Sequence, residues 1–173
     1  MDHYIPKRRV PVTLWSGELP GLAGSIFLDL DVAGNQHQTI LEKLNESARF
    51  LPVAVGSEGR IHLVNKSRLA RVTAGASVIH SDVFARGFQP WREEDAEVLL
   101  RDGTSLRGRI WMRLERSTQR VSDFMNQRGG DFFTLLTPVA VHLVNAGAVI
   151  NIQVSESAGA ALSNGREDER SAA

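Results

Sequence analysis

The tetrapeptide His-Leu-Val-Asn occurs twice in this chain, at residues 62–65 and again at 142–145. Both copies lie within the same series of segments. A short apolar run that ends in Asn comes before each copy, followed by a segment that begins with an aromatic residue, and a short β-rich run comes after it. Because the series repeats together with the tetrapeptide, we interpret the chain as an internal duplication.

Apolar residues alternate in one segment of each copy. The alternating positions are Ile26, Leu28 and Leu30 in the first copy, and Ile110, Met112 and Leu114 in the second. A period of two is typical of a strand with one buried face. In the first copy this predicts that Asp29 and Asp31 point to solvent. In the second copy, Asp102 and Gly103 predict the hairpin turn that leads into the strand.

A short helix is predicted before each aromatic-led strand. Thr39 and Glu42 have the spacing of a capping box, which predicts a helix from Thr39 to about Asn45. Apolar residues at helical spacing between 121 and 125 predict a second helix that reaches Asn126. We therefore expect Asn45 and Asn126 to be structural equivalents. Each would end its helix through a left-handed backbone conformation or through an amide hydrogen bond to the following turn.

The fold class predicted from these patterns is mainly β with short helices, built as two tandem small β-barrel-like units related by duplication. The first unit spans residues 10–72 and the second spans 96–154. Apolar residues in the connector, 73–95, predict that it packs against both units. The composition of 155–173 predicts a disordered tail.

The composition of the chain argues against several classes of protein. Its 173 residues include 20 basic and 20 acidic ones, so there is no net positive charge to attract nucleic acid or an anionic membrane. The absence of cysteine excludes disulfides and thiolate chemistry. The N-terminal segment is too polar for a signal peptide, and no apolar run approaches the roughly 20 residues of a spanning helix. We expect a cytoplasmic protein that is not inserted in a membrane.

Motifs for catalysis or metal binding are missing from the sequence. The five histidines form no HExxH motif and no pair at helical spacing, so no metal site is predicted. His62 and His142 form either a symmetric functional pair or two side chains that suit the same place in a strand, and duplication favours the second interpretation. No phosphate-binding loop or nucleophile motif occurs. The sequence therefore predicts no enzyme, no catalytic residue and no cofactor.

A basic stretch near residue 111 is the main candidate for an interaction surface. Trp111 alternates with Arg109 and Arg113, and small β-barrels bind single-stranded nucleic acid through such basic, aromatic faces. The alternative is a solvated strand face whose charges are paired. Trp is also enriched at protein interfaces, so Trp111 is equally consistent with a contact between units or subunits.

The sequence resembles a little-characterised family of small bacterial β-rich domains of unknown function, here as a tandem duplication. Residues 121–126, Val-Ser-Asp-Phe-Met-Asn, followed by Phe132 and Phe133, carry the resemblance, together with Asn65 and its basic neighbour Lys66. Residues 40–45 lack the Ser-Asp pair. In the second copy, the position after Asn145 is not basic. The resemblance covers both repeats, is specific mainly in the second, and assigns no activity.

We therefore predict a non-catalytic protein-binding, scaffolding or regulatory role, with a protein partner or a second copy of the chain as ligand. Asn45, Asn65, Asn126 and Asn145 are predicted to be structural repeat positions. The alternative function is a small-barrel protein that binds single-stranded nucleic acid. The balanced charge weighs against that alternative.

Overall fold

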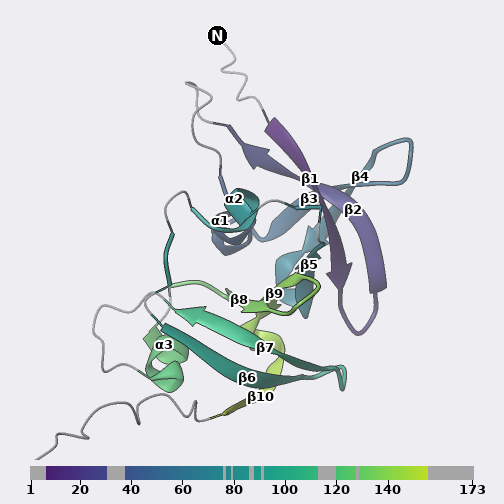
Figure 1. Ribbon diagram of the computed structural model, residues 1–173. Helices are drawn as coiled ribbons and strands as arrows, with labels where there is room; N and C mark the ends of the chain where they lie inside the picture. The colour runs from purple at the N-terminus through teal and green to yellow at the C-terminus, as the bar shows by residue number, and fades with distance from the viewer. Residues whose placement is uncertain are drawn as a thin grey trace, which may run out of the picture.

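The computed structural model describes residues 7–30, 38–75, 77–78, 80–85, 88–90, 92–112, 120–127 and 129–155. Its described strands form one antiparallel sheet of ten strands in the order β10-β6-β7-β8-β9-β5-β1-β2-β3-β4, which confirms a mainly β fold (Figure 1). No helix in these ranges is long and apolar enough to cross a membrane. The predicted tail from residue 156 onward lies outside the described residues.

Two similar series of elements make up the sheet. The first consists of β1 (Lys7–Trp15), β2 (Pro20–Asp29), α1 (Ile40–Asn45), β3 (Phe50–Val55), β4 (Arg60–Asn65), the 3₁₀ helix η1 (Lys66–Arg68) and β5 (Arg71–Ala74). After α2 (His80–Val83), the second consists of β6 (Arg92–Leu100), β7 (Ser105–Met112), α3 (Val121–Gln127), β8 (Phe132–Leu136), β9 (Val141–Asn145), η2 (Ala146–Ala148) and β10 (Val149–Val154).

The strand pairing is the same in both halves. In the first half the order is β5-β1-β2-β3-β4, and in the second it is β10-β6-β7-β8-β9. The halves join where β5 pairs with β9. The predicted β-barrel-like units are not closed, because β5 uses its second edge for β9 rather than for β4. Within the described residues, the sheet stays open at β4 and at β10.

The first short helix begins as its capping pattern predicts. Thr39 caps α1, its hydroxyl accepts a hydrogen bond from the Glu42 backbone N–H (3.1 Å), and the Glu42 carboxylate accepts one from the Thr39 N–H (2.8 Å). In α3 the Asp123 carboxylate accepts a similar bond from the Arg120 N–H (2.9 Å). Both helices thus begin with a carboxylate that holds the preceding backbone N–H.

The connector between the halves is shorter than predicted. Strand β6 begins at Arg92, so the acidic residues 93–95 belong to a strand. Glu94 is buried and forms an ion pair with Arg92, which explains how an acidic residue is accommodated on an inward-facing position of β6. The Asp102-Gly103 turn is confirmed, because Gly103 adopts a φ of 82° between β6 and β7.

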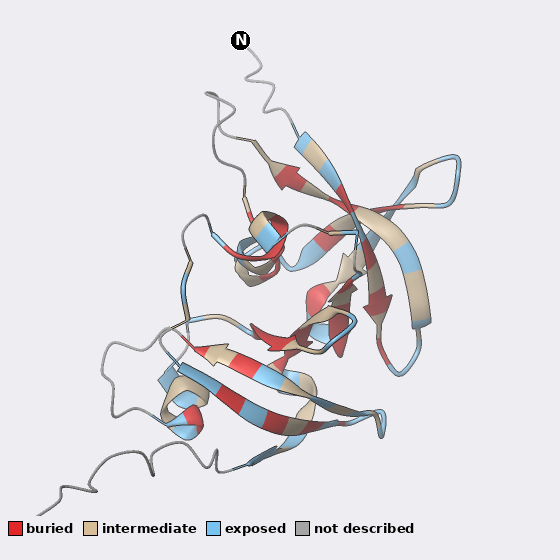
Figure 2. Cartoon of the chain, viewed as in Figure 1, coloured by how far each residue is buried: buried red, intermediate tan, exposed pale blue. Residues whose placement is uncertain are grey.

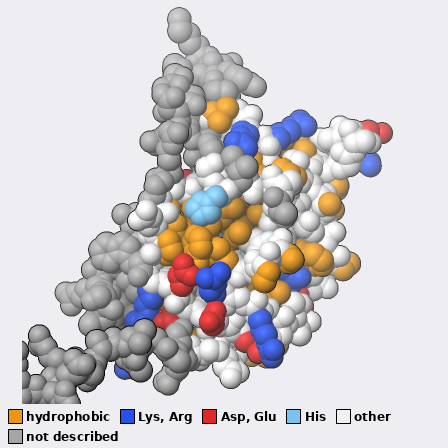
Figure 3. Space-filling model, in the orientation of Figure 1, with side chains coloured by type: hydrophobic (Ala, Val, Ile, Leu, Met, Phe, Trp, Pro, Cys, Tyr) orange, Lys and Arg blue, Asp and Glu red, His pale blue; other side chains and the backbone are white. Residues whose placement is uncertain are grey.

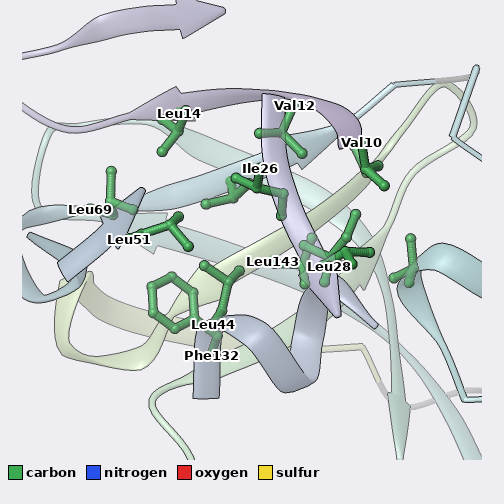
Figure 4. Close-up of a cluster of buried hydrophobic side chains, with 14 of the residues drawn as sticks. Val10, Val12, Leu14, Ile26, Leu28, Leu44, Leu51, Leu69, Phe132 and Leu143 are labelled. Carbon is green, nitrogen blue, oxygen red and sulfur yellow. The ribbon is translucent and has the colours of Figure 1, made fainter. Parts of the chain in front are cut away.

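Two hydrophobic clusters form the core, and each contains residues from both halves. Figure 2 shows buried positions on strands of both halves. Figure 4 shows Phe132 and Leu143 from the second half packed among side chains of the first, next to Leu44 and Leu51. Ala70 from the first half belongs to the second cluster. Because the clusters share residues across the junction, neither half buries its core alone.

Candidate interaction site

The arginines predicted to form an interaction surface are paired with acidic residues. Arg109 on β7 contacts Glu93 on β6 at 2.8 Å, and Arg107 contacts Glu97 at 2.9 Å. All four side chains lie on adjacent strands, where opposite charges face each other. Arg113 lies outside the described residues. The described part of this strand face therefore presents neutralised charge.

Trp111 lies on the same face of β7 as Arg109, but its ring is covered by residues of the connector. The ring centroids of Phe84 and His80 lie 5.1 Å and 5.7 Å from it, and that of Phe88 lies at 6.3 Å. Figure 3 shows hydrophobic side chains gathered beside a histidine, with charged side chains next to them. Trp111 is therefore a contact between β7 and the α2 region, and its ring is not open for a base to stack on.

His142 lies in the junction between the halves. Its Nδ1 is 3.0 Å from the hydroxyl oxygen of Thr73, directly across the β5 and β9 pair. Burial and, as a smaller cause, the positive charge of Arg71 together lower the pKa of His142 to about 4. The ring is consequently neutral near pH 7. Its counterpart in the first tetrapeptide, His62, is exposed on β4.

Asn145 connects the two halves through its side-chain amide. Its Nδ2 donates to the Leu69 carbonyl at 2.8 Å, and its Oδ1 accepts from the Gly147 N–H at 2.9 Å. Asn65 makes the second bond in the same way, because its Oδ1 accepts from the Ser67 N–H at 3.2 Å. Both residues thus cap a 3₁₀ helix, and Asn145 also binds the other half of the chain.

Asn45 does not end its helix in the way the sequence predicted. Glu46 follows it in an extended conformation, so α1 does not end in a left-handed residue. Within the described residues, the Asn45 amide makes no hydrogen bond to the turn that follows the helix. Instead its Nδ2 donates to the Phe132 carbonyl (3.1 Å) and its Oδ1 accepts from the Phe132 N–H (2.9 Å). The amide thus pairs with β8 as a strand peptide would. Asn126 is exposed in α3.

The basic neighbour of Asn65 has a structural role. Lys66 is buried, and its ammonium group donates to the carbonyls of Leu44 (2.9 Å) and Glu46 (2.5 Å) at the end of α1. Burial lowers the pKa of Lys66, and the nearby Glu46 carboxylate opposes that shift. A positive charge at a helix C-terminus also suits the helix dipole. Lys66 therefore fixes α1 against η1.

The free edge of the sheet at β4 is apolar and lies beside a groove. Ile61 and Leu63 are exposed on this strand, as is Phe50 at the start of β3. The groove is lined by Ser16, Glu18, Leu19, Leu22, Arg68, Leu69 and the residues of β4. The unpaired backbone groups of β4 and these apolar side chains together form what we call the β4 edge, residues 60–65 with Phe50.

The opposite edge of the sheet, which we call the β10 edge (residues 149–154), is also apolar. Ile150 and Val154 are exposed on β10, and Leu99 is exposed on the neighbouring strand β6. Within the described residues, β10 pairs only with β6. In the same part of the chain, no three His, Asp or Glu side chains lie close enough together to hold a metal ion. The two open edges of the sheet thus both present exposed apolar side chains.

Sequence reasoning located the elements of this site but missed its exposed edge. Leu63 and Leu143 occupy the same place in identical tetrapeptides, so no local signal separates the exposed residue from the buried one. The hydrogen bonds that Asn45 and Asn145 make to the other half of the chain also have no local signal in the sequence, so they were not predicted. The chain matches no protein-family model, and no curated protein or solved structure similar to it was found.

Proposed function

We propose that the protein is a non-catalytic scaffold that binds a protein partner through the β4 edge. The observation that carries this proposal is an unpaired strand with exposed apolar side chains beside a groove. Natural proteins usually protect such an edge with a lysine, a proline or a bulge. The one formal charge on β4, Arg60, lies at its first residue, so residues 61–65 are left unprotected. An edge of this kind favours a binding role.

The chemistry of the β4 edge fits strand addition. An extended segment of a partner would pair with the free N–H and C=O groups of β4, while its alternate side chains contact Ile61 and Leu63. Main-chain hydrogen bonds would supply affinity, and the groove would select side chains. The ligand is therefore an extended, largely apolar polypeptide segment.

The proposal includes the internal duplication of one small five-stranded β unit. Strand order, the two Asn-capped 3₁₀ helices and the paired tetrapeptides support it. Gly24 on β2 and Gly108 on β7 add a further correspondence, because a Cβ at either position would collide with the carbonyl oxygen of Ala54 or Leu136 on the next strand. Each half thus brings its strands together at an equivalent glycine.

Nucleic-acid binding is the competing function, and the described residues support it less. The arginines of β7 are paired with carboxylates, and Trp111 is covered by Phe84 and Phe88. Stacking platforms for single strands need exposed aromatic faces and unpaired positive charge. The β4 edge offers apolar side chains instead.

Selection from a phage library of random octapeptides tests the proposed function. We expect the protein to enrich peptides with alternating apolar residues, and we expect Leu63→Arg to abolish that enrichment. Arg107→Gln, on the distant strand β7, serves as the matched control and should leave it unchanged. A selection that enriches no peptide, or one that Leu63→Arg leaves intact, would refute the β4 edge as the binding surface.

Titration with labelled oligo-dT and oligo-U tests the competing function. We expect no salt-sensitive binding at micromolar protein concentration. A dissociation constant of about 1 μM or lower that weakens steeply with salt would instead favour the nucleic-acid alternative.

A further inference from the structure

We propose that the partner of the β4 edge is the β10 edge of a second copy of this chain, so that copies join head to tail. The proposal rests on the proposed function, because it names the ligand of the same surface. Its basis is that the chain already contains one example of this contact, the pairing of β5 with β9.

The two free edges are the counterparts of the two strands that meet inside the chain. At the internal junction, the last strand of the first half (β5) pairs with the fourth strand of the second half (β9). The strands left open in the described residues are the fourth strand of the first half (β4) and the last strand of the second half (β10). The two open edges of one copy are therefore equivalent to the two strands that pair with each other at the internal junction.

The register of the new contact follows from the internal one. Val72 faces Leu143, and Thr73 faces His142, across the internal junction. The same alignment places Ile152 of one copy opposite Leu63 of the next, and Gln153 opposite His62. The Gln153 amide would then take the place of the Thr73 hydroxyl beside the histidine ring.

Equivalent residues of the two halves differ in solvent exposure in the way that this contact requires. Leu143 is 0% exposed at the internal junction, whereas Leu63 is 67% exposed on β4. Phe132 and Phe50, which begin β8 and β3, are 3% and 50% exposed. The apolar residues of the second half that are buried against the first half thus have exposed apolar counterparts in the first half. Burying them is the main driving force for association.

The last strands of the two halves, β5 and β10, differ in solvent exposure in the same way. Ala70, just before β5, is 6% exposed, and its counterpart Ile150 is 61% exposed. Strand β10, with sequence Val-Ile-Asn-Ile-Gln-Val, has no charged residue that would keep another strand away. Large apolar residues on an uncharged edge fit a strand that is covered in the assembled protein.

Within the described ranges, the side-chain amide of Asn65 is a hydrogen-bond donor that has no counterpart of the bond made by Asn145. The Asn145 amide nitrogen donates to the Leu69 carbonyl across the internal junction. In the described residues the Asn65 amide nitrogen has no such acceptor, although Asn65 and Asn145 cap their 3₁₀ helices alike. The counterpart of Leu69 is Val149. In the proposed assembly, Asn65 would donate to the Val149 carbonyl of the neighbouring copy.

The contact joins two different edges, so each copy keeps one of each kind free for another neighbour. Such a heterologous contact repeats until the copies close a ring or form a filament. The proposal therefore predicts assemblies larger than two chains rather than an isolated dimer.

Cross-linking of single-cysteine variants tests the contact, and the native chain has no cysteine to interfere. Cysteines at His62 and Gln153 would face each other across the new strand pair, at a separation close to what a disulfide needs. We expect a mixture of His62→Cys and Gln153→Cys proteins to form a disulfide-linked dimer under mild oxidation. Neither variant alone should do so. Cross-links within His62→Cys alone would show a symmetric β4 contact instead and would overturn the proposal.

Sedimentation velocity gives the second test, from about 1 to about 200 μM protein. We expect the native chain to assemble as concentration rises, and we expect Leu63→Arg to weaken assembly at least about tenfold, because a charge would be buried there. Arg107→Gln is the matched control. A native chain that remains single at the highest concentration overturns the head-to-tail contact. The proposed function would still stand if that chain selects peptides through the β4 edge, and both would fall if it does not.

Discussion

Strands β9 and β4 contain the same tetrapeptide, but they lie in different surroundings. Strand β9 is paired on both sides, by β8 and β5, and its leucine is fully buried. Strand β4 is paired only with β3, and its leucine is exposed. Since the residues are identical, the difference comes from the surroundings of each strand, which for β9 include β5 and the core cluster of the first half. The comparison shows that β4 carries an apolar surface whose counterpart elsewhere in the molecule is part of the core.

Their histidines show how the same difference changes chemistry. His142 faces Thr73 across the junction, and burial lowers its pKa to about 4. His62 lies exposed on the open edge. At the junction the histidine ring is thus buried and hydrogen-bonded, whereas on the open edge it is exposed. Four experiments test this contrast, beginning with the one expected to have the largest effect.

Separating the halves should have the largest effect. An isolated fragment of residues 92–155 would expose Leu143 and Phe132, which now pack in the core cluster of the first half. We expect the fragment to be unfolded by circular dichroism, and the whole chain to melt in a single calorimetric transition. A fragment as stable as the whole chain, or two resolved transitions, would show that the halves are independent.

Shortening the two equivalent leucines compares the edges directly. Leu143→Ala removes a fully buried side chain and should lower the free energy of unfolding by about 2–5 kcal/mol. Leu63→Ala, on the exposed edge, should change it by less than about 0.5 kcal/mol. Urea denaturation at submicromolar concentration, where assembly is weakest, measures both. Equal losses would contradict the difference in burial.

Replacing the equivalent asparagines compares a residue that joins the halves with one that does not. Asn45→Ala leaves the N–H and C=O of Phe132 without their amide partner and should cost about 1–3 kcal/mol. Asn45→Gly should be at least as damaging, because α1 does not end in a left-handed residue there. Asn126→Ala, at an exposed helical position, should be neutral. An Asn45→Gly protein as stable as the native one would restore the backbone explanation.

His142 should contribute to the pH dependence of stability. The pKa of His142 is lowered in the folded state, so the unfolded chain binds more protons between about pH 6.5 and pH 4. Its stabilising contribution is therefore complete above about pH 6.5 and is lost as pH falls towards 4. We expect about 1–2 kcal/mol, less than the full shift implies, because the ring is partly exposed.

The measurement is the free energy of unfolding of the native chain minus that of His142→Gln, followed over this pH range. His62→Gln is the matched control and should track the native chain. If the difference between native and His142→Gln proteins does not change with pH, the histidine is not buried in its neutral form.

Much of the fold could be predicted because its signals are local. The capping box at Thr39 and Glu42 lies within four residues, and the turn at Gly103 depends on two. The strand around Ile26 and Ile110 follows from alternation alone, and both residues are buried. Pro52 lies in an interior strand, but β2 pairs with β3 only at Val53 and Ala54, so Pro52 has a paired neighbour on one side.

The candidate site could not be predicted because it depends on contacts between distant residues. Asn45 binds Phe132, and Trp111 packs against Phe84; nothing in the spacing of these residues indicates either contact. The sequence correctly placed Trp111 and Arg109 on one strand face. It did not indicate that Glu93 would pair with the arginine.

The sequence by itself determined two similar series of strands and their short helices, because periodicity and capping act over a few residues. Only the tertiary structure decided which copy of the tetrapeptide is buried. The physical reason is that an antiparallel strand has two edges, and its own sequence does not specify whether a distant segment occupies the second one. Strand β5 occupies that edge of β9 and leaves the same edge of β4 open.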